Sequence, residues 1–343
     1  MSKSSCVAIV VLNYNTEVLL SKYLPSILAT NYDNKEIWVV DNASTDGSLA
    51  LLHENYLDQI KVLQTPKNLG YAGGYNWALS QINAKYYVLI NSDVRVTKDW
   101  LQPLVKMAEN NDQIAAIQPK ILADKNPDFF EYAGASGGYL DCWGYAFCRG
   151  RIMDALEKDN NQYDSAVPIF WASGACLFVR STAFHAVHGF DDDLFAHMEE
   201  IDLCWRLQHQ GHQIYVEPQS IVYHLGGGTL SEGSSFKYFL NFRNSLIVLS
   251  KNTTSTFWML QVLWRMVLDG LASIKFIADG KPQLIGAILK AHGAYWSTLN
   301  KTLHKRKRIQ LSSKHQPKVY QRSIIWAYFI LKKKKFTALK DVE

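Results

Sequence analysis

The first half of the chain alternates between two hydrophobic periodicities. Short runs rich in β-branched residues occupy residues 6–12, 37–40, 60–63 and 86–90. Apolar residues at helical spacing fill the stretches between these runs, at about 17–30, 45–55 and 72–83. Strands that alternate with helices in this way predict right-handed βαβ units around a mainly parallel sheet, an α/β fold.

The second half has a less regular pattern. Residues 123–170 are rich in Gly, Asp and Asn with little periodicity, which is typical of a long binding loop or lid. Further on, the pattern predicts strands at 176–179, 214–216 and 222–224, a helix near 199–210, and a helical stretch over 236–297. Gly226-Gly227-Gly228 marks a break before that stretch. We therefore expect one domain over residues 1–230, divided near residue 95, and a helical extension over 231–343.

Composition supports a folded protein. Hydrophobic residues make up 48% of the 343 residues and charged residues 20%, so a large core is available and a disordered chain is excluded. Aromatic residues reach 13%, with 10 Trp. Such richness suits stacking platforms or a membrane interface, although large aromatic core residues explain it equally well.

The net charge of +5 hides a strong asymmetry. Residues 301–343 contain 13 Lys and Arg but only 2 Asp and Glu, so the remainder of the chain is mildly acidic. Within this tail, the apolar run 323–331 precedes four lysines at 332–335, a pattern that suits anionic lipid headgroups. Basic tails also bind nucleic acid, but the acidic body would repel it and no nucleic-acid module is present. Residues 256–277, apolar but interrupted by charges, favour an interfacial helix or one packed on the domain.

Cysteines and long apolar runs bear on localisation. The five cysteines form no CxxC pair and are odd in number, which favours a reducing compartment over disulfides or a zinc site. The start of the chain does not resemble a signal peptide, and no run reaches the roughly 18–20 apolar residues of a membrane span. We expect a cytoplasmic protein.

Polar clusters follow three of the predicted strands: Asn13 and Asn15 the first, Asp41-Asn42 the second, and Asn91-Ser92-Asp93 the fourth. Parallel sheets bind ligands beyond the carboxyl ends of their strands. Asp41 is placed to accept a hydrogen bond from a nucleotide, whereas helix capping better explains Ser44 to Asp46. Oxygen ligands at Asn91-Ser92-Asp93 suit Mg²⁺ or Mn²⁺, and a simple turn at a strand end is the equal alternative.

A Gly-rich turn opens the third predicted helix. It contains Asn68, Gly70, Gly73 and Asn76. Glycines allow close backbone approach to a ligand, and a helix N-terminus favours phosphate. The turn lacks the spacing of a dinucleotide site and the ending of a P-loop, so the signal is weak by itself.

An acidic cluster begins the helix predicted at 199–210. Glu199 and Glu200 point about 100° apart, so one can face a cleft as a general base while the other braces the loop. Stabilisation of the helix dipole, and an i,i+4 pair between Asp202 and Arg206, are the structural alternatives. His224 follows a strand-like run and becomes a ligand candidate only if it lies beside Asp93.

Taken in order, these segments resemble the family-2 glycosyltransferases of GT-A fold. The nucleotide-binding series of the family resembles residues 10–15, 39–47 and 68–70. Its Asp-x-Asp metal motif resembles residues 89–93, and its acceptor-side Glu-Asp segment resembles residues 190–203. The strand whose histidine completes the metal site resembles residues 222–224. The resemblance covers about residues 6–250. It is strongest for the rhamnosyltransferase-like branch, which builds bacterial surface polysaccharides.

Two positions depart from the family pattern. Asn91 stands where the first acid of Asp-x-Asp is usual, which weakens the expectation of metal dependence. Glu199-Glu200 replaces the usual Glu-Asp pair, so the base would be Glu200, with Asp202 as its rival.

The resemblance implies an inverting transfer from a UDP- or dTDP-sugar, with dTDP-rhamnose as one candidate, to a hydroxyl of a lipid-linked saccharide at the inner face of the plasma membrane. Residues 1–95 would bind the nucleotide and 96–230 the acceptor. Asp41 would accept from the pyrimidine N3–H, with Asn13 and Asn15 near the nucleoside. Asp93 and His224 would hold Mn²⁺ or Mg²⁺. The segment expected to face the sugars contains Trp171, Ser173, Gly174 and Ala175, with Arg149 and Arg151 either binding an acceptor phosphate or lying as solvated loop charges.

Two other classes of protein compete with this interpretation. A nucleotidyltransferase would carry a Gly-rich loop with Arg and Lys directly after the first strand, where Asn13-Tyr14-Asn15-Thr16 offers none. A non-catalytic subunit of a polysaccharide assembly complex could bind the nucleotide sugar and have lost its chemistry through Asn91.

Overall fold

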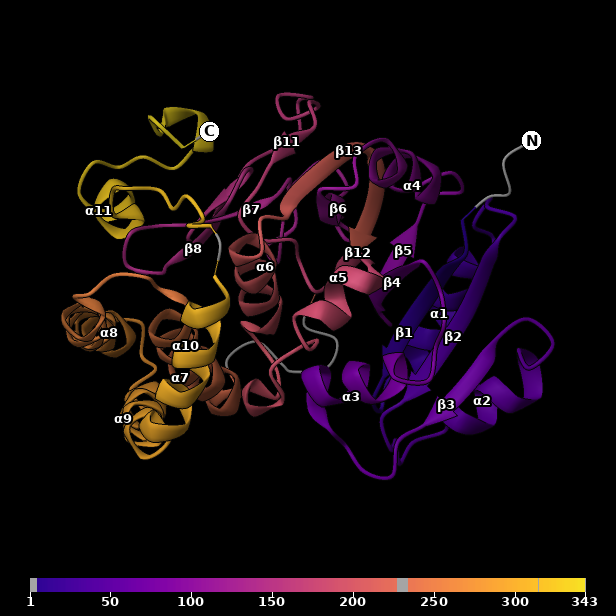
Figure 1. Ribbon diagram of the computed structural model, residues 1–343, viewed down its shortest axis with the longest axis horizontal. Coiled ribbons are helices and arrows are strands. Elements are labelled where there is room, and N and C mark those ends of the chain that lie inside the picture. Colours follow the sequence, from indigo (N-terminus) through magenta and orange to yellow (C-terminus); the bar gives the residue numbers. More distant parts are fainter. Residues whose placement is uncertain (1–4, 227–233, 314, 343) are drawn as a thin grey trace.

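A computed structural model describes residues 5–226, 234–313 and 315–342. Its main feature is a nine-stranded sheet with the order β11-β13-β6-β12-β4-β1-β2-β3, in which β5 pairs with β13 (Figure 1). Helices cover both faces of this sheet, and a group of C-terminal helices lies beside it (Figure 1). The predicted α/β class and the helical extension are confirmed.

The N-terminal half has the predicted alternation. Strands β1 (Val7–Asn13), β2 (Lys35–Asp41), β3 (Lys61–Gln64) and β4 (Tyr86–Asn91) alternate with helices α1 (Glu17–Leu28), α2 (Ser48–Asn55) and α3 (Gly70–Leu79). The order β4-β1-β2-β3 is parallel throughout, as expected for βαβ units. The carboxyl ends of β1, β2 and β4 therefore meet at one edge of the sheet.

The other half of the sheet is mixed. It contains β5 (Val94–Val96), β6 (Ile114–Ala123), β11 (Val167–Pro168), β12 (Cys176–Arg180) and β13 (Gln213–His224), with helices α4 (Leu101–Asn110), α5 (Ser181–Ala186), η1 (Asp192–Leu194) and α6 (Glu199–His209). Strand β12 runs antiparallel to both β4 and β6. The two strands predicted at 214–216 and 222–224 form a single strand, β13, whose register shifts between Glu217 and Ile221. The sequence did not predict β5, β6 and α4.

The core lies in two layers because successive strand residues point to opposite faces. Along β1, Val7, Ile9 and Val11 pack with one layer that includes apolar residues of α1, α2 and α4. Ala8 and Val10 pack with the other layer, which includes residues of α3, α5 and α6. Burial on both faces explains the nearly continuous apolar runs of the central strands.

The segment predicted to be an irregular loop contains a second sheet. Strands β7 (Gly138–Leu140), β8 (Ala146–Cys148), β9 (Arg151–Ile152) and β10 (Ala155–Leu156) form an antiparallel meander with the order β10-β9-β8-β7. Two-residue and three-residue strands are too short to show a period, so the expectation was wrong here. Gly138 is required in this sheet, because a Cβ at this position would lie 2.1 Å from the ring of Trp171.

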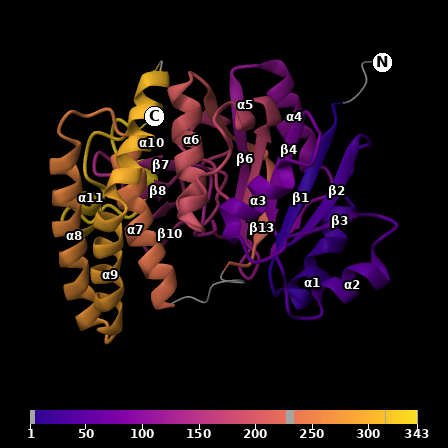
Figure 2. The same cartoon turned by 60° about the horizontal axis from the view of Figure 1, so that its bottom comes forward.

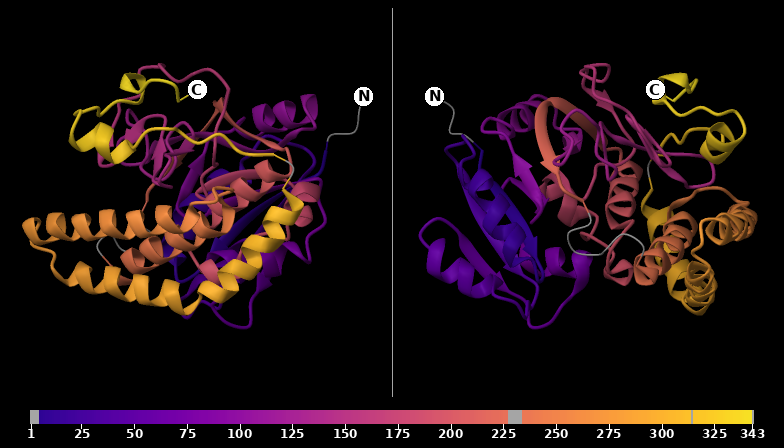
Figure 3. Two further views of the ribbon diagram at one scale, coloured as in Figure 1. Left: turned by 60° about the vertical axis from the view of Figure 1, so that its left-hand side comes forward. Right: turned by 180° about the vertical axis from the view of Figure 1, so that it is seen from behind.

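The helical stretch predicted at 236–297 is confirmed as three helices, α7 (Ser235–Asn252), α8 (Trp258–Ala278) and α9 (Gln283–Ser297). Helix α7 contacts α6, α9 and α10 (Leu299–Ser312), and α8 and α9 form a hairpin (Figure 2; Figure 3). The predicted break after Gly226 and the domain boundary at residue 230 lie outside the described residues.

The basic tail beyond α10 is ordered against the domain. It forms α11 (Ile324–Phe329) and the short helix η2 (Phe336–Ala338). Phe336 is buried, its N–H donates to Glu157 Oε1 at 2.8 Å, and its ring lies 5.1 Å from that of Tyr139. The tail thus completes the core of the small sheet.

Candidate active site

The donor edge, which we define as the loops after β1, β2 and β4, is a network of buried polar side chains. Asn13 Nδ2 donates to Asp41 Oδ1 at 3.0 Å, and the Ser44 N–H donates to Asp41 Oδ2 at 3.0 Å. Asp41 therefore closes the turn that follows β2, a capping role that the sequence did not suggest for it. A carboxylate accepts about four hydrogen bonds, so Asp41 keeps capacity for a ligand.

The loop after β1 is tied to the loop after β2. Asn15 has a left-handed backbone (φ 52°), and its Oδ1 accepts from the Thr45 N–H at 2.7 Å. Asp46 Oδ2 accepts from the N–H of Glu17, the first residue of α1. These contacts fix the shape of the donor edge before any ligand binds.

The Gly-rich turn is largely used for packing. Asn42 Nδ2 donates to Asn68 Oδ1 at 3.1 Å and to the Gly70 carbonyl at 3.0 Å. The first N–H groups of α3, from Tyr71 and Ala72, donate to the Phe195 carbonyl at 2.7 and 3.2 Å. The start of α3 thus binds a protein carbonyl where the sequence suggested an open phosphate site.

Two further positions of that turn face the same loop. Asn76 Nδ2 donates to the Phe190 carbonyl and its Oδ1 accepts from the Phe190 N–H, both at 2.9 Å. A Cβ added at Gly73 would lie 3.1 Å from Leu69 Cβ and 4.0 Å from Asp192 Oδ1. Both residues therefore hold the loop before α6 against α3.

The turn after β4 brings the predicted metal ligands together. His224 Nε2 lies 3.1 Å from Asp93 Oδ1, and both side chains are buried. On the other side of the ring, His224 Nδ1 lies 3.3 Å from Glu131 Oε2. Burial opposes a charge on His224, but Glu131 and Asp93 outweigh it and raise the pKa of the imidazole to about 10. His224 therefore lies beside Asp93, which was the condition for a ligand role.

The remaining residues of that turn link neighbouring elements. Ser92 Oγ lies 2.9 Å from Thr16 Oγ1 in the loop after β1. The Asn91 N–H donates to the Ala175 carbonyl at 3.1 Å. The turn after β4 is thus held by the loop after β1 and by the segment before β12.

Asp93 and His224 lie side by side and carry donor atoms of kinds that bind divalent cations. The 3.1 Å between His224 Nε2 and Asp93 Oδ1 is the length of a hydrogen bond between the two side chains. Within the described residues, no group of three or more His, Cys, Asp or Glu side chains is arranged to hold a metal. Two protein ligands completed by substrate phosphates are typical of Mg²⁺ sites.

The acid end of α6, which we define as residues 197–200, carries unpaired polar atoms. Glu199 Oε2, Glu200 Oε2 and His197 Nε2 are buried without a hydrogen-bond partner. Burial raises the pKa of Glu200 to about 7, and burial together with the Glu200 charge raises that of Glu199 well above its usual range. Burial lowers the pKa of His197 to about 4. Glu200 is thus poised to exchange a proton near neutral pH.

Asp202 has a different environment. Its Oδ2 accepts from Arg206 Nε at 2.8 Å, and its Oδ1 lies 2.8 Å from Lys251 Nζ and 2.7 Å from Asn252 Nδ2. Burial opposes the charge, but Arg206 and Lys251 outweigh it and lower the pKa of Asp202. With every oxygen paired and a lowered pKa, Asp202 is a structural anchor between α6 and α7, and we withdraw it as a rival base.

The segment before β12 lies between the metal-ligand pair and α6. Tyr71 Oη donates to the Gly174 carbonyl at 2.7 Å. A Cβ added at Gly174 would lie 2.9 Å from Tyr71 Oη. Burial raises the pKa of Tyr71, and the charges of Tyr75, Glu199 and Glu200 raise it further. The Tyr71 N–H also donates to the Phe195 carbonyl, which ties this residue to the loop before α6. Two other members are used internally: Trp171 Nε1 donates to the Tyr139 carbonyl, and Ser173 Oγ accepts from the Ala175 N–H.

The two arginines of the small sheet are both buried, so neither is a solvated loop charge. Arg149 Nη1 donates to the carbonyl of Ser165 and Nη2 to its hydroxyl, both at 3.1 Å. Arg151 has weaker partners, the Met153 carbonyl and Cys148 Sγ, both at 3.3 Å, and stacks 4.3 Å from the Tyr132 ring centre. Arg151 is the better placed of the two to bind an anion.

Sequence reasoning missed two residues of the site. Glu131 contacts His224 but lies in the segment without periodicity, where no pattern singles out one acid among several. Tyr71 lies inside the Gly-rich turn, and only its contact with Gly174 identifies it.

Comparison with known proteins agrees with this geometry. The model of glycosyl transferase family 2 matches residues 8–174. An N-acetylglucosaminyl-diphospho-decaprenol L-rhamnosyltransferase of Mycobacterium tuberculosis is 25% identical over 277 residues, covering 75% of this chain and 88% of the relative. The rhamnosyltransferase WbbL of Escherichia coli is 26% identical over 156 residues, covering 43% of this chain and 58% of the relative.

Solved structures share the fold. A mannosyltransferase of Pyrobaculum calidifontis, in complex with GDP-Man and Mn²⁺, has a TM-score of 0.54 at 15% identity and covers 91% of this chain and 86% of its own. GalNAc-T7, with UDP, GalNAc and Mn²⁺, has a TM-score of 0.58 at 16% identity, covering 73% of this chain and 48% of its own. The matched family model, these relatives and the shared GT-A fold make the chain similar to the family-2 glycosyltransferases, and among these to the rhamnosyltransferase-like branch.

Proposed function

We propose that the enzyme transfers a sugar, with inversion, from a UDP- or dTDP-sugar to a hydroxyl of a lipid-linked saccharide during cell-surface polysaccharide synthesis. Rhamnose from dTDP-rhamnose is the first candidate, because two similar proteins are named as rhamnosyltransferases. The observation that carries the proposal is Glu200, a carboxylate with an unpaired, buried oxygen and a pKa raised to about 7.

In this proposal, each side of the site has one task. Residues 1–95 bind the nucleotide, with Asp41 accepting from the base, and residues 96–230 bind the acceptor. Asp93 and His224 would hold Mn²⁺ or Mg²⁺, which when bound stabilises negative charge on the leaving diphosphate. Glu200 accepts the proton of the acceptor hydroxyl. At the same time the hydroxyl oxygen attacks the anomeric carbon, and the bond between that carbon and the diphosphate breaks. A single displacement inverts the anomeric configuration.

The acceptor side needs a cation if the saccharide is carried on a lipid diphosphate. We assign this task to Arg151, because its guanidinium is buried among the weak acceptors Met153 O and Cys148 Sγ. Arg149 donates through Nη1 and Nη2 to Tyr163 and Ser165 and would hold that loop.

The test combines donor binding with transfer. Thermal unfolding is followed with UDP- and dTDP-sugars, with and without Mn²⁺, and transfer is measured for the wild type, Glu200→Gln and Asp202→Asn. We expect Glu200→Gln to bind the donor normally and to lose transfer by about 10²–10⁴-fold. Asp202→Asn should lower the unfolding temperature through loss of its two ion pairs. Normal transfer by Glu200→Gln would contradict the mechanism.

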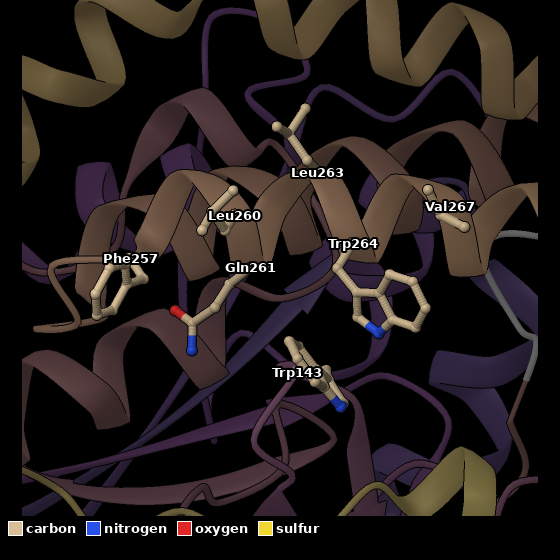
Figure 4. Close-up of a pocket in the computed structure, with 7 residues that line it drawn as sticks. All are labelled: Trp143, Phe257, Leu260, Gln261, Leu263, Trp264 and Val267. Carbon is tan, nitrogen blue, oxygen red and sulfur yellow. The ribbon is translucent and has the colours of Figure 1, made fainter.

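We further propose that the enzyme works at the cytoplasmic face of the plasma membrane, held there by α8 and α11. No described helix is long and apolar enough to cross a bilayer. Helix α8 nevertheless exposes an apolar stripe along its outer side, formed by Phe257, Leu260, Trp264, Val267, Leu271 and Ile274, each 47–69% exposed. Trp143, from the turn before β8, extends this stripe with its ring 6.2 Å from that of Trp264 (Figure 4).

Helix α11 lies on the same side of the molecule as α8 (Figure 1; Figure 3). Trp326, Ile330 and Leu331, in and just after α11, are more than half exposed, and the lysines 332–335 follow them directly. Exposed apolar stripes edged by lysines match the interfacial region of an anionic membrane. This arrangement would bring a lipid-linked acceptor to the enzyme within the plane of the membrane.

Vesicle sedimentation tests this surface. The double variant Leu260→Glu/Leu271→Glu should bind phosphatidylglycerol-containing vesicles about 100-fold more weakly, since each buried leucine contributes roughly 1.5–3 kcal/mol. The matched control, Val18→Glu/Leu57→Glu, changes exposed apolar residues of the donor half and should bind as the wild type does. Equal binding by both double variants would refute the proposed surface. A concentration-dependent dimer without lipid, lost only in the α8 variant, would assign the stripe to a second copy of the chain.

A further inference from the structure

The loop before α6 has an unfavourable backbone conformation. Phe195, His197 and Met198 all have φ between 63° and 73°, the left-handed region that residues with a Cβ rarely adopt. Met198 is the N-cap residue of α6, so this conformation sets the direction in which the helix begins. Glu199 and Glu200 follow directly. The loop therefore needs contacts from elsewhere to hold it in place.

Asn244 on α7 supplies such contacts. It is fully buried, and its Nδ2 lies 2.8 Å from the Leu194 carbonyl, 2.9 Å from that of Ala196 and 2.8 Å from that of His197. Its Oδ1 in turn accepts from Arg243 Nε at 2.9 Å. One amide group thus joins three carbonyls of the left-handed loop.

The Phe195 carbonyl, to which Asn244 does not hydrogen-bond, is bound by α3. Phe195 O accepts from the first N–H groups of α3, at Tyr71 and Ala72. The loop is therefore fastened between α3 of the donor half and α7 of the helical extension. Lys251, Lys301 and Lys305 pair with Asp191 and Asp193, and so hold the earlier part of the loop.

We infer that Asn244 is a positioning residue: it fixes loop 194–198 so that the first turn of α6 holds Glu200 with its Oε2 unpaired and ready for the acceptor. The inference rests on the proposed role of Glu200 as the base. It gives the helical extension a part in catalysis, because the donors that set the geometry of the acid end come from α7.

Asn252 provides a matched control on the same helix. It is also buried, but its Nδ2 donates to Asp202 Oδ1 and the Val248 carbonyl, and among the described residues its side chain makes no hydrogen bond to loop 194–198. Asn244→Ala and Asn252→Ala remove a buried amide of the same kind from one helix. Any difference between the two variants therefore reports on the loop.

The experiment measures kcat, acceptor KM, donor affinity and unfolding temperature for the wild type, Asn244→Ala, Asn244→Asp, Asn252→Ala and Glu200→Gln. We expect both Asn244 variants to lower kcat by about 10–100-fold with donor affinity unchanged, because small displacements of a catalytic group have effects of this size. Asn244→Asp should be at least as impaired as Asn244→Ala, since it keeps the shape but turns an oxygen toward the carbonyls. Asn252→Ala should lower the unfolding temperature and leave kcat unchanged.

Two outcomes would overturn the inference: unchanged kcat in Asn244→Ala, or an equal loss of kcat in Asn244→Ala and Asn252→Ala. If Asn244→Ala does not fold, Asn244→Ser replaces it, because the hydroxyl keeps one shorter donor and should give an intermediate kcat. Failure of the proposed function is recognised separately, since Glu200→Gln would then retain transfer whatever the Asn244 variants do.

Discussion

The donor edge and the acid end of α6 are built in opposite ways. At the donor edge, Asn13, Asp41 and Asn42 hydrogen-bond with each other and with neighbouring loops, so their positions are set within the protein. At the acid end, Glu199 and Glu200 each keep a buried oxygen without a partner. A site that must recognise a constant ligand benefits from rigid preorganisation, whereas a group that must accept a proton has to remain unpaired.

The buried, unpaired oxygens of the acid end lower the stability of the folded protein. Buried polar atoms without hydrogen bonds cost roughly 1–3 kcal/mol each. Asp202, one turn further along α6, has the opposite environment, since its oxygens pair with Arg206 of α6 and Lys251 of α7. Acids on one helix thus differ in whether their oxygens have partners.

The largest of these effects removes the negative charge of Asp93 at the donor edge. Asp93→Asn should lower kcat/KM by about 10²–10³-fold, because the leaving diphosphate loses its electrostatic stabilisation. Chelation of divalent cations should have the same effect on the wild type and little further effect on the variant. The measurement is transfer rate against added Mn²⁺, with Asp99→Asn, an exposed acid before α4, as control. A metal requirement unaltered in Asp93→Asn would remove Asp93 from the site.

A smaller effect concerns the pH dependence of transfer. It tests whether Glu200 is unpaired while the side chains of the donor edge are hydrogen-bonded. Because the pKa of Glu200 is raised to about 7, the base is protonated below that pH, and kcat/KM should rise about tenfold per unit up to pH 7 and then level off. Glu199, Tyr71, Cys148 and Cys204 are the titratable groups that share its surroundings. The residual transfer of Glu200→Gln should lack this acid limb. An acid limb near pH 4.5 in the wild type would show that Glu200 is solvated. The proposed difference between the donor edge and the acid end would then be refuted.

The smallest expected effect lies at the donor edge. Asn13→Ala removes a donor to Asp41 and an acceptor for Thr16, so the free energy of unfolding should fall by about 1–3 kcal/mol. Donor KM should rise while kcat stays near the wild-type value, because the loops lose their shape but the base is untouched. Calorimetric unfolding and a donor titration check both values. A fall in kcat with unchanged donor KM would mean that the two regions are not separable.

Much of the fold and site could be predicted from the sequence, because the information was local. Strand periodicity followed by polar residues at the carboxyl ends predicted the sheet edge and placed Asp41 and Asp93 on it. His224 was recognised from its strand and found beside Asp93. The choice between Glu200 and Asp202 was not local: both stand on one helix turn, and only Lys251 and Asn252, from α7, distinguish them.

Contacts between distant segments could not be predicted. Asn76 and Gly73 stand in a turn typical of ligand binding, and in the structure they lie against the distant loop at 190–192. The small sheet was missed because its strands are too short for a period. Asn244, in a helix with many polar residues, gives no sign in the sequence that three carbonyls converge on it.

The placement of Phe336 in the small sheet has a consequence for the order in which the protein is made. Strands β1–β4 pair with each other in the order β4-β1-β2-β3, so this part of the sheet can begin to form before β12 and the loop at 190–195 have been added. The meander β7–β10 cannot close its core until residues 336–339 have been added, since Phe336 packs against Tyr139, Phe147 and Tyr163. The parallel part of the main sheet would therefore form well before the small sheet closes around Phe336.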